Sequence, residues 1–129
     1  MPSRKHKLLI IDDDPFLMAL YSQKFLEEGY VVQGAQTAEA GFEEAKRLKP
    51  EIILLDMMLP DSDGFTLCKR LKRSKETAAS IVVFLSNVSQ PNYREQARIL
   101  GAVDYLVKAY LEPSEIVERI NEIIEAKKA

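Results

Sequence analysis

Hydrophobic residues gather in five short runs along the chain, and polar residues rarely interrupt the interior of these runs. The runs cover residues 7–12, 30–35, 51–56, 81–86 and 103–107. A continuous apolar run of about four to eight residues is typical of a strand buried on both faces of a sheet. The pattern therefore predicts five buried strands.

The segments between these runs carry apolar residues at helical spacing, together with the start and stop signals of helices. Asp14 and Pro15 predict the N-cap and the first position of a helix that ends near Gly29. Thr37 predicts the cap of a second helix that runs to about residue 48. The inward face of the first helix is predicted from its apolar residues Leu17, Leu20, Tyr21 and Phe25.

Three more helices are predicted in the second half of the chain. One follows Gly64 over roughly ten residues, and another carries Tyr93 and Ala97 and ends at Gly101. Ser114 predicts the cap of the last helix, which has a stripe of isoleucine and valine residues at helical spacing. Because strands and helices alternate, we expect an α/β fold with a parallel, doubly wound sheet that is covered on both faces.

Polar side chains stand at the carboxyl ends of the predicted strands, where such sheets collect their functional groups. Asp12 ends the first strand and Asp13 follows it. Asp56, Ser86 and Lys108 stand at the ends of the third, fourth and fifth strands. Carboxylates that cluster in one crevice repel one another, and a hard divalent cation relieves that repulsion. The pattern therefore predicts a Mg²⁺ site at this edge of the sheet.

A metal ion, a lysine and hydrogen-bond donors together suit phosphoryl transfer, because they neutralise the oxygens of the transferred group. A carboxylate can also act as the nucleophile and form an acyl phosphate. We therefore predict Asp56 as the nucleophile and Asp13 as a metal ligand. Ser86 is predicted to donate a hydrogen bond to the phosphoryl group, and Lys108 to act as the counter-cation.

Four motifs resemble the receiver domains of two-component response regulators. They are Leu-Leu-Ile-Ile-Asp-Asp-Asp-Pro, Ile-Ile-Leu-Leu-Asp-Met-Met-Leu-Pro-Asp-Ser-Asp-Gly, Val-Val-Phe-Leu-Ser and Gly-Ala-Val-Asp-Tyr-Leu-Val-Lys, in family order and at family spacing. The resemblance covers essentially the whole chain. It implies a CheY-like, flavodoxin-like sheet of strand order 2-1-3-4-5, and one receiver domain over residues 1–129 with its core at about 7–126.

The resemblance also implies a role for each matching residue. Asp56 would accept a phosphoryl group from a sensor histidine kinase or a phosphotransfer protein. Asp12 and Asp13 would hold Mg²⁺ together with Asp56, and Met58 would contribute its backbone carbonyl. The chain would catalyse only its own phosphotransfer and dephosphorylation, so it would not be an enzyme acting on other substrates.

A switch is implied by the same resemblance. Ser86 matches the hydroxyl residue that reorients toward the phosphoryl group, Tyr105 matches the aromatic residue that swings inward, and Lys108 matches the lysine that pairs with phosphoryl oxygens.

Two residues depart from the family pattern. Ala109 follows Lys108 where a proline, often with a cis peptide bond, is usual, so we expect a trans or a strained bond. Asn87 follows Ser86 where a small residue is usual, and we hypothesise that it overhangs the site and changes the access of the hydrolytic water.

Composition and charge limit the partners and the location. The formal net charge of −2 gives no basic field, so we expect no direct nucleic-acid binding. The apolar runs are too short for a bilayer, the basic N-terminus lacks the apolar stretch of a secretory signal, and Cys68 is the single cysteine. We therefore expect a cytoplasmic protein without a membrane partner, whose readout acts on a homodimer mate or a downstream target.

Three alternatives stay open from the sequence. A phosphatase of the haloacid dehalogenase kind would use Asp12 and Asp14, but it needs an acidic pair after Lys108, where only Glu112, Glu115 and Glu118 stand. A receiver-like module that signals without phosphorylation is favoured by the two departures and opposed by the complete acidic set. The chain could also be the receiver part of a longer regulator with its own output domain.

Overall fold

Five strands form the sheet that the hydrophobic pattern predicts. They are β1 (Lys7–Ile11), β2 (Val31–Ala35), β3 (Ile52–Leu55), β4 (Ile81–Ser86) and β5 (Asp104–Val107). The computed structural model describes residues 6–128. All four strand pairs are parallel, and the order β2-β1-β3-β4-β5 is the predicted one.

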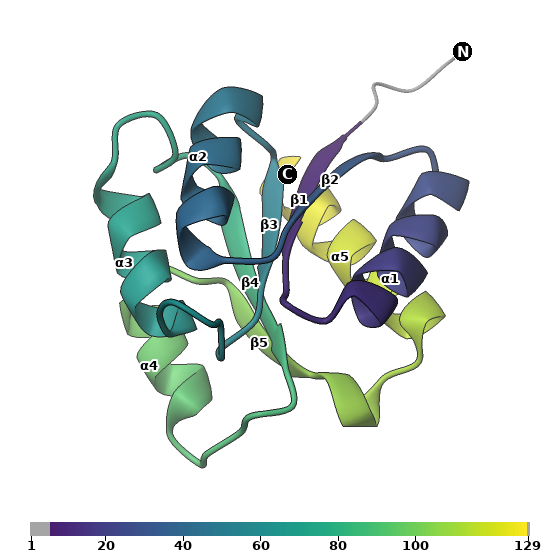
Figure 1. Cartoon of the computed structure of the whole chain (residues 1–129). Coiled ribbons are helices and arrows are strands. Elements are labelled where there is room, and N and C mark those ends of the chain that lie inside the picture. The colour runs from purple at the N-terminus through teal and green to yellow at the C-terminus, as the bar shows by residue number, and fades with distance from the viewer. Residues whose placement is uncertain (1–5, 129) are drawn as a thin grey trace.

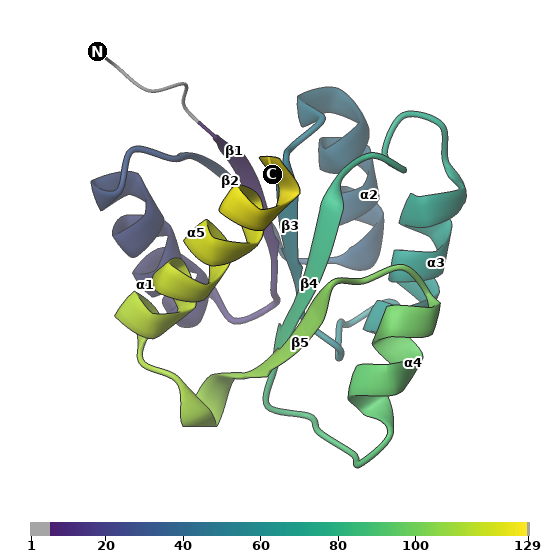
Figure 2. The same ribbon diagram turned by 180° about the vertical axis from the view of Figure 1, so that it is seen from behind.

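Two layers of helices cover the sheet, as Figures 1 and 2 show from opposite sides. Helices α1 (Pro15–Glu27) and α5 (Pro113–Lys128) lie side by side on one face. The other face carries α2 (Ala38–Leu48), α3 (Gly64–Arg73) and α4 (Tyr93–Ile99). Among the helices of residues 6–128, none has both the length and the apolar character needed to cross a membrane.

Each central strand contributes side chains to two hydrophobic cores, one on each face of the sheet, which explains why its residues are apolar at every interior position. Leu9 and Ile11 pack into the core beneath α2, α3 and α4, whereas Leu8 and Ile10 pack into the core beneath α1 and α5. Because successive side chains of a strand point to opposite faces, a strand covered on both sides needs apolar residues throughout. All four of these residues are at most 1% exposed.

The predicted helix caps are confirmed for the first two helices. The Asp14 carboxylate accepts hydrogen bonds from the backbone N–H groups of Phe16 and Leu17, at 3.0 and 3.2 Å. The Thr37 hydroxyl accepts one from Ala40 N–H at 3.0 Å. These contacts satisfy N–H groups that the first turn of a helix leaves without a helical partner.

Two predictions about helices are wrong. Ser114 does not cap the last helix, because α5 begins at Pro113 and the Glu112 carbonyl accepts the hydrogen bond from Ile116 N–H at 3.1 Å. Proline suits the first helical position, where an N–H would have no helical partner. Leu20 does not face the core either: it is 37% exposed on α1, while Tyr21 and Phe25 are buried.

Candidate functional site

Three aspartates come together at the carboxyl edge of the sheet. Asp12 and Asp13 follow β1, Asp56 follows β3, and one carboxylate oxygen of each lies within 4.8 Å of the other two. The register that places Ile11 beside Leu55 brings these strand ends level. Asp12 and Asp56 are buried and Asp13 is exposed. Such a set of oxygen donors fits a hard cation that retains several of its waters.

Lys108 lies against this cluster and is the first residue of the short 3-10 turn η1 (Lys108–Tyr110). Its Nζ is 2.7 Å from Asp12 Oδ2 and 3.1 Å from Asp56 Oδ2. Burial raises the pKa of Asp12 by more than the hydrogen bond with Lys108 lowers it. Burial by itself lowers the pKa of Lys108, but the two carboxylates outweigh it and hold that pKa above its ordinary value. The site thus combines one ammonium group with three carboxyl groups.

Asp56 is held in place by backbone contacts on both sides. Its N–H donates to the Ile11 carbonyl at 3.0 Å, and its Oδ1 accepts from Met58 N–H at 3.4 Å. Gly64 passes so close that an added Cβ would lie 2.6 Å from the Asp56 carbonyl oxygen and 2.7 Å from Cε2 of Phe84. Only glycine fits this approach. Composition and spacing had identified Gly64 only as a turn residue before a helix.

Ser86 and Tyr105 lie beside each other beneath the loop that connects β4 with α4. Ser86 is fully buried, and its Oγ accepts a hydrogen bond from Val88 N–H at 3.2 Å. The Tyr105 ring stacks on Phe84 with 5.3 Å between centroids, and its hydroxyl donates to the Val88 carbonyl. Burial raises the pKa of Tyr105 to about 12. Tyr105 therefore occupies an inward position, with its hydroxyl attached to the backbone of this loop.

Asn87 and Ala109, the two departures from the family pattern, contact each other. Asn87 Oδ1 accepts a hydrogen bond from Ala109 N–H at 2.8 Å. Residues 6–128 contain no cis peptide bond, so the bond between Lys108 and Ala109 is trans, which is one of the two predicted outcomes. The Asn87 amide oxygen therefore faces the turn after β5, and the hypothesis about water access stays a prediction.

Asp61 and Asp63 belong to the loop before α3 and cap two different helices. Asp63 Oδ1 accepts from Thr66 N–H at 2.8 Å and is the N-cap of α3. Asp61 accepts from Ala38 N–H at 2.8 Å and from Glu39 N–H at 3.0 Å, at the start of α2. The second contact leaves no local pattern in the sequence, because its partners are 23 positions apart. The loop after Asp56 is thereby attached to α2.

The acidic residues after Lys108 do not join the cluster. Glu115 accepts a hydrogen bond from Glu112 N–H at 2.7 Å in the first turn of α5, and Glu118 lines a hollow between α1 and α5. Within residues 6–128, the carboxylates that could share a cation with Asp56 are those of Asp12 and Asp13. The geometry therefore lacks the downstream acidic pair that a phosphatase of the haloacid dehalogenase kind requires.

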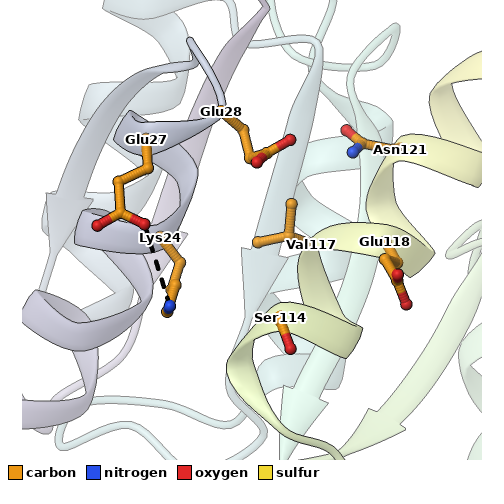
Figure 3. Close-up of a pocket in the computed structure, with 7 residues that line it drawn as sticks. All are labelled: Lys24, Glu27, Glu28, Ser114, Val117, Glu118 and Asn121. Carbon is orange, nitrogen blue, oxygen red and sulfur yellow. Dashed lines mark ion pairs between the residues drawn. The ribbon is translucent and has the colours of Figure 1, made fainter.

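The hollow between α1 and α5 has a volume of about 270 Å³ and is shown in Figure 3. Its walls come from the end of α1 and the first turns of α5, and include the ion pair of Lys24 with Glu27 at 4.0 Å. Its lining residues are Lys24, Glu27, Glu28, Ser114, Val117, Glu118 and Asn121. None of the predicted site residues lines it, so the predicted chemistry belongs to the edge of the sheet.

A family model described as the response regulator receiver domain matches residues 8–121. The chain belongs to this family. The receiver domain is 39% identical over 118 residues to RpaA, a DNA-binding dual master transcriptional regulator of Synechocystis. It is 30% identical over 118 residues to PhoP, the alkaline phosphatase synthesis transcriptional regulatory protein of Bacillus subtilis. Each match covers 92% of this chain and 48% of the relative, so the chain spans about half the length of these curated relatives.

Solved structures share the architecture of this receiver domain. A putative response regulator from Chloroflexus aurantiacus matches with a TM-score of 0.85 and 30% identity, over 95% of this chain and 99% of that chain. A CheY-like receiver domain protein from Methanospirillum hungatei matches with a TM-score of 0.89 and 23% identity, over 97% and 98%. The predicted family and the predicted CheY-like fold are therefore confirmed.

Proposed function

We propose that this receiver domain accepts a phosphoryl group on the carboxylate of Asp56 from the phosphohistidine of a sensor histidine kinase or phosphotransfer protein. The observation that carries the proposal is the position of Lys108, whose Nζ lies 3.1 Å from Asp56 Oδ2 beside a cluster of three carboxylates. A nucleophilic carboxylate next to a fixed cation is the arrangement that phosphoryl transfer to a side chain needs.

In the proposed transfer, one carboxylate oxygen of Asp56 attacks the phosphorus atom. An O–P bond forms while the N–P bond of the phosphohistidine breaks, and the electron pair of the broken bond stays on the imidazole nitrogen. The Lys108 ammonium neutralises charge on the phosphoryl oxygens, and the Ser86 hydroxyl donates a hydrogen bond to one of them. Later, water attacks phosphorus: a new O–P bond forms while the O–P bond to Asp56 breaks, inorganic phosphate leaves, and Asp56 returns to its carboxylate form. Both steps use the residues of this site, and the domain modifies no other substrate.

The donor set at the edge of the sheet fits Mg²⁺, because its converging oxygens come from three carboxylates. We assign Asp12, Asp13 and Asp56 as ligands, with the backbone carbonyl of Met58 as a further one. Bound Mg²⁺ would supply positive charge to the phosphoryl oxygens. Asp13 is the exposed member of the set, so it offers the open side through which a hydrated ion enters.

We assign Ser86 and Tyr105 as the switch that carries the signal outward. When the Ser86 hydroxyl turns to a phosphoryl oxygen, its hydrogen bond with Val88 N–H is lost and the loop repacks around Tyr105. Phosphorylation would thus shift the populations of two loop conformations. The surface that changes would bind a homodimer mate or a downstream target, without direct nucleic-acid binding by this domain. We further propose that residues 1–129 form one receiver domain, which acts in the cytoplasm.

The experiment that tests this proposal measures intact mass after incubation with Mg²⁺ and acetyl phosphate. We expect the parent protein to gain the mass of one phosphoryl group. The Asp56→Asn variant and a sample with chelator should show no gain. A gain that persists in the Asp56→Asn variant would place the acceptor elsewhere and contradict the proposal.

A second candidate is a module that signals without phosphorylation, and the departures from the family pattern at Asn87 and Ala109, which contact each other, favour it. Beryllofluoride with Mg²⁺ separates the two candidates, since it mimics a phosphoryl group on a competent aspartate. Binding by the parent and not by Asp56→Asn would support the acceptor. No binding by a folded parent that also gains no phosphoryl mass would support the module.

A further inference from the structure

A hydrogen bond joins the two loops that carry the proposed phosphoryl-binding side chains. Asn87 follows Ser86 at the end of β4, and Ala109 follows Lys108 at the end of β5. The bond from Ala109 N–H to Asn87 Oδ1 is 2.8 Å long and spans 22 positions of sequence. The last paired residues of the two strands are Ser86 and Val107, so this contact continues the connection of the strands beyond the sheet.

The contact depends on both residue types. A proline at position 109 would have no N–H to donate, and an alanine or glycine at position 87 would have no oxygen to accept. The two residues that depart from the family pattern therefore act as donor and acceptor of one bond. Without a proline ring, the backbone at position 109 has more conformational freedom. In the folded protein, the hydrogen bond with Asn87 restricts part of that freedom.

The Asn87 end of the bond is firmly anchored. On one side Ser86 is buried in β4, and on the other side Val88 donates its N–H to Ser86 Oγ and accepts the hydroxyl of Tyr105 at its carbonyl. The Ala109 end is weakly anchored, because η1 is one 3-10 turn that ends with a bond of 3.3 Å from Leu111 N–H to the Lys108 carbonyl. The hydrogen bond therefore holds the backbone of the turn at Ala109 in place relative to the end of β4.

The position of this turn determines where the Lys108 side chain begins, because Lys108 is its first residue. Its ammonium reaches both Asp12 Oδ2 and Asp56 Oδ2, and its side chain is only 8% exposed. The lysine stem is flexible but of limited length, so the ammonium reaches both oxygens at once only from a limited range of backbone positions. We infer that Asn87 is a positioning residue, which fixes the Lys108 turn over Asp56 through the N–H of Ala109. The inference deepens, and rests on, the proposed acceptor function of Asp56.

The first test measures hydrogen exchange of the Ala109 amide by NMR, which requires no phosphorylation. We expect this amide to be protected in the parent and to exchange faster in Asn87→Ala. Asn92→Ala is the matched control, because Asn92 is exposed and makes no side-chain cap bond in the same loop region. Asn87→Asp keeps an acceptor oxygen and should retain the protection.

The second test measures beryllofluoride affinity with Mg²⁺ for the same variants. Loss of one ordinary hydrogen bond corresponds to a change of about twofold to tenfold, and we expect Asn87→Ala to weaken binding by that factor. Asn92→Ala should bind as the parent does. In a Lys108→Ala background, Asn87→Ala should change the affinity by less than about twofold, since it acts through Lys108.

The outcomes separate this inference from the proposed function. An Ala109 amide that exchanges equally fast in the parent and in Asn87→Ala would overturn the bond itself. An equal loss of affinity with and without Lys108 would show a general effect on the fold and overturn the positioning role. If Asn87→Ala binds beryllofluoride as tightly as the parent does, only the inference about Asn87 is refuted. If the folded parent does not bind beryllofluoride, the proposed function is refuted as well.

Discussion

At the scale of single residues, the site depends on one ammonium group shared by two buried carboxylates. Lys108 contacts Asp12 and Asp56 at 2.7 and 3.1 Å, and all three side chains are at most 10% exposed. Burying charge is costly unless the charge is paired, and removal of one partner leaves the others uncompensated. A bound divalent cation would lower the same cost. Bound Mg²⁺ would therefore stabilise the same pair of carboxylates that Lys108 stabilises.

We predict that Lys108→Met lowers the free energy of unfolding by about 3 kcal/mol without Mg²⁺, because two buried carboxylates lose their cation. Added Mg²⁺ should restore part of this loss, so it should stabilise the variant more than the parent. Urea unfolding followed by circular dichroism, with and without Mg²⁺, measures both effects.

Lys75→Met is the matched control for this prediction, since Lys75 is exposed. Its free energy of unfolding should stay close to that of the parent and should respond to Mg²⁺ in the same way. Equal stability of Lys108→Met and the parent in the absence of Mg²⁺ would contradict the account.

At the scale of elements, the loop between β3 and α3 is attached to the start of α2 by Asp61. Its carboxylate accepts hydrogen bonds from Ala38 and Glu39 N–H, beside the local cap that Thr37 provides. A negative charge also interacts favourably with the N-terminal end of the helix dipole. These backbone hydrogen bonds lower the pKa of Asp61. The loop that follows the proposed acceptor thus depends on a helix that is distant in sequence.

We predict that Asp61→Ala is less stable than the parent near pH 7, and that the difference shrinks as the pH falls. The pKa of Asp61 is lower in the folded than in the unfolded state, so its contribution is complete above the unfolded pKa of about 3.9. The contribution is lost as the pH falls below the unfolded pKa and through the lower folded pKa. Denaturant unfolding over this pH range measures the difference.

Asp61→Asn is the informative companion variant, because it keeps one acceptor oxygen but does not titrate in this range. Its loss of stability should be smaller than that of Asp61→Ala and should not depend on the pH between 3 and 7, within about the error of the measurement. A difference between Asp61→Ala and the parent that is constant over this range would argue against an ionised cap.

At the scale of the whole molecule, the sheet separates two cores, and each core is sealed by its own helices. Cys68 lies in the core beneath α2, α3 and α4, fully buried, with its Sγ 3.8 Å from the Leu100 carbonyl. Burial raises the pKa of its thiol to about 11. Because the thiolate is the reactive form, Cys68 can report how often this side of the molecule opens.

We predict that iodoacetamide labels Cys68 in the native protein at least about a hundredfold more slowly than in urea, at about pH 8. At that pH a thiol of ordinary pKa is partly ionised, whereas one with a pKa of about 11 is almost entirely protonated. Intact mass as a function of time measures both rates. The control is Ser89→Cys in a Cys68→Ala background, which places the only thiol at an exposed position. Iodoacetamide should label this thiol rapidly in the native state.

Local sequence was sufficient to predict the elements of this receiver domain, their order and the residues at the ends of the strands. Buried strands and amphipathic helices leave periodic patterns in the sequence. The carboxyl ends of parallel strands lie at one edge of the sheet, so the sequence predicts that Asp12, Asp13, Asp56 and Lys108 lie close together. The start of α5 was mispredicted, because a serine after a proline resembles a cap from local sequence alone.

Contacts between distant loops were decided only by the tertiary structure. The cap that Asp61 forms on α2 spans 23 positions, and the bond between Asn87 and Ala109 spans 22. The close approach of Gly64 to the Asp56 carbonyl likewise depends on how α3 packs beside β3 and β4. Such contacts leave no periodic pattern in the sequence, because they depend on the paths that two loops take after the sheet has formed. The sequence determined which residues stand at the edge of the sheet, and packing determined which of them touch.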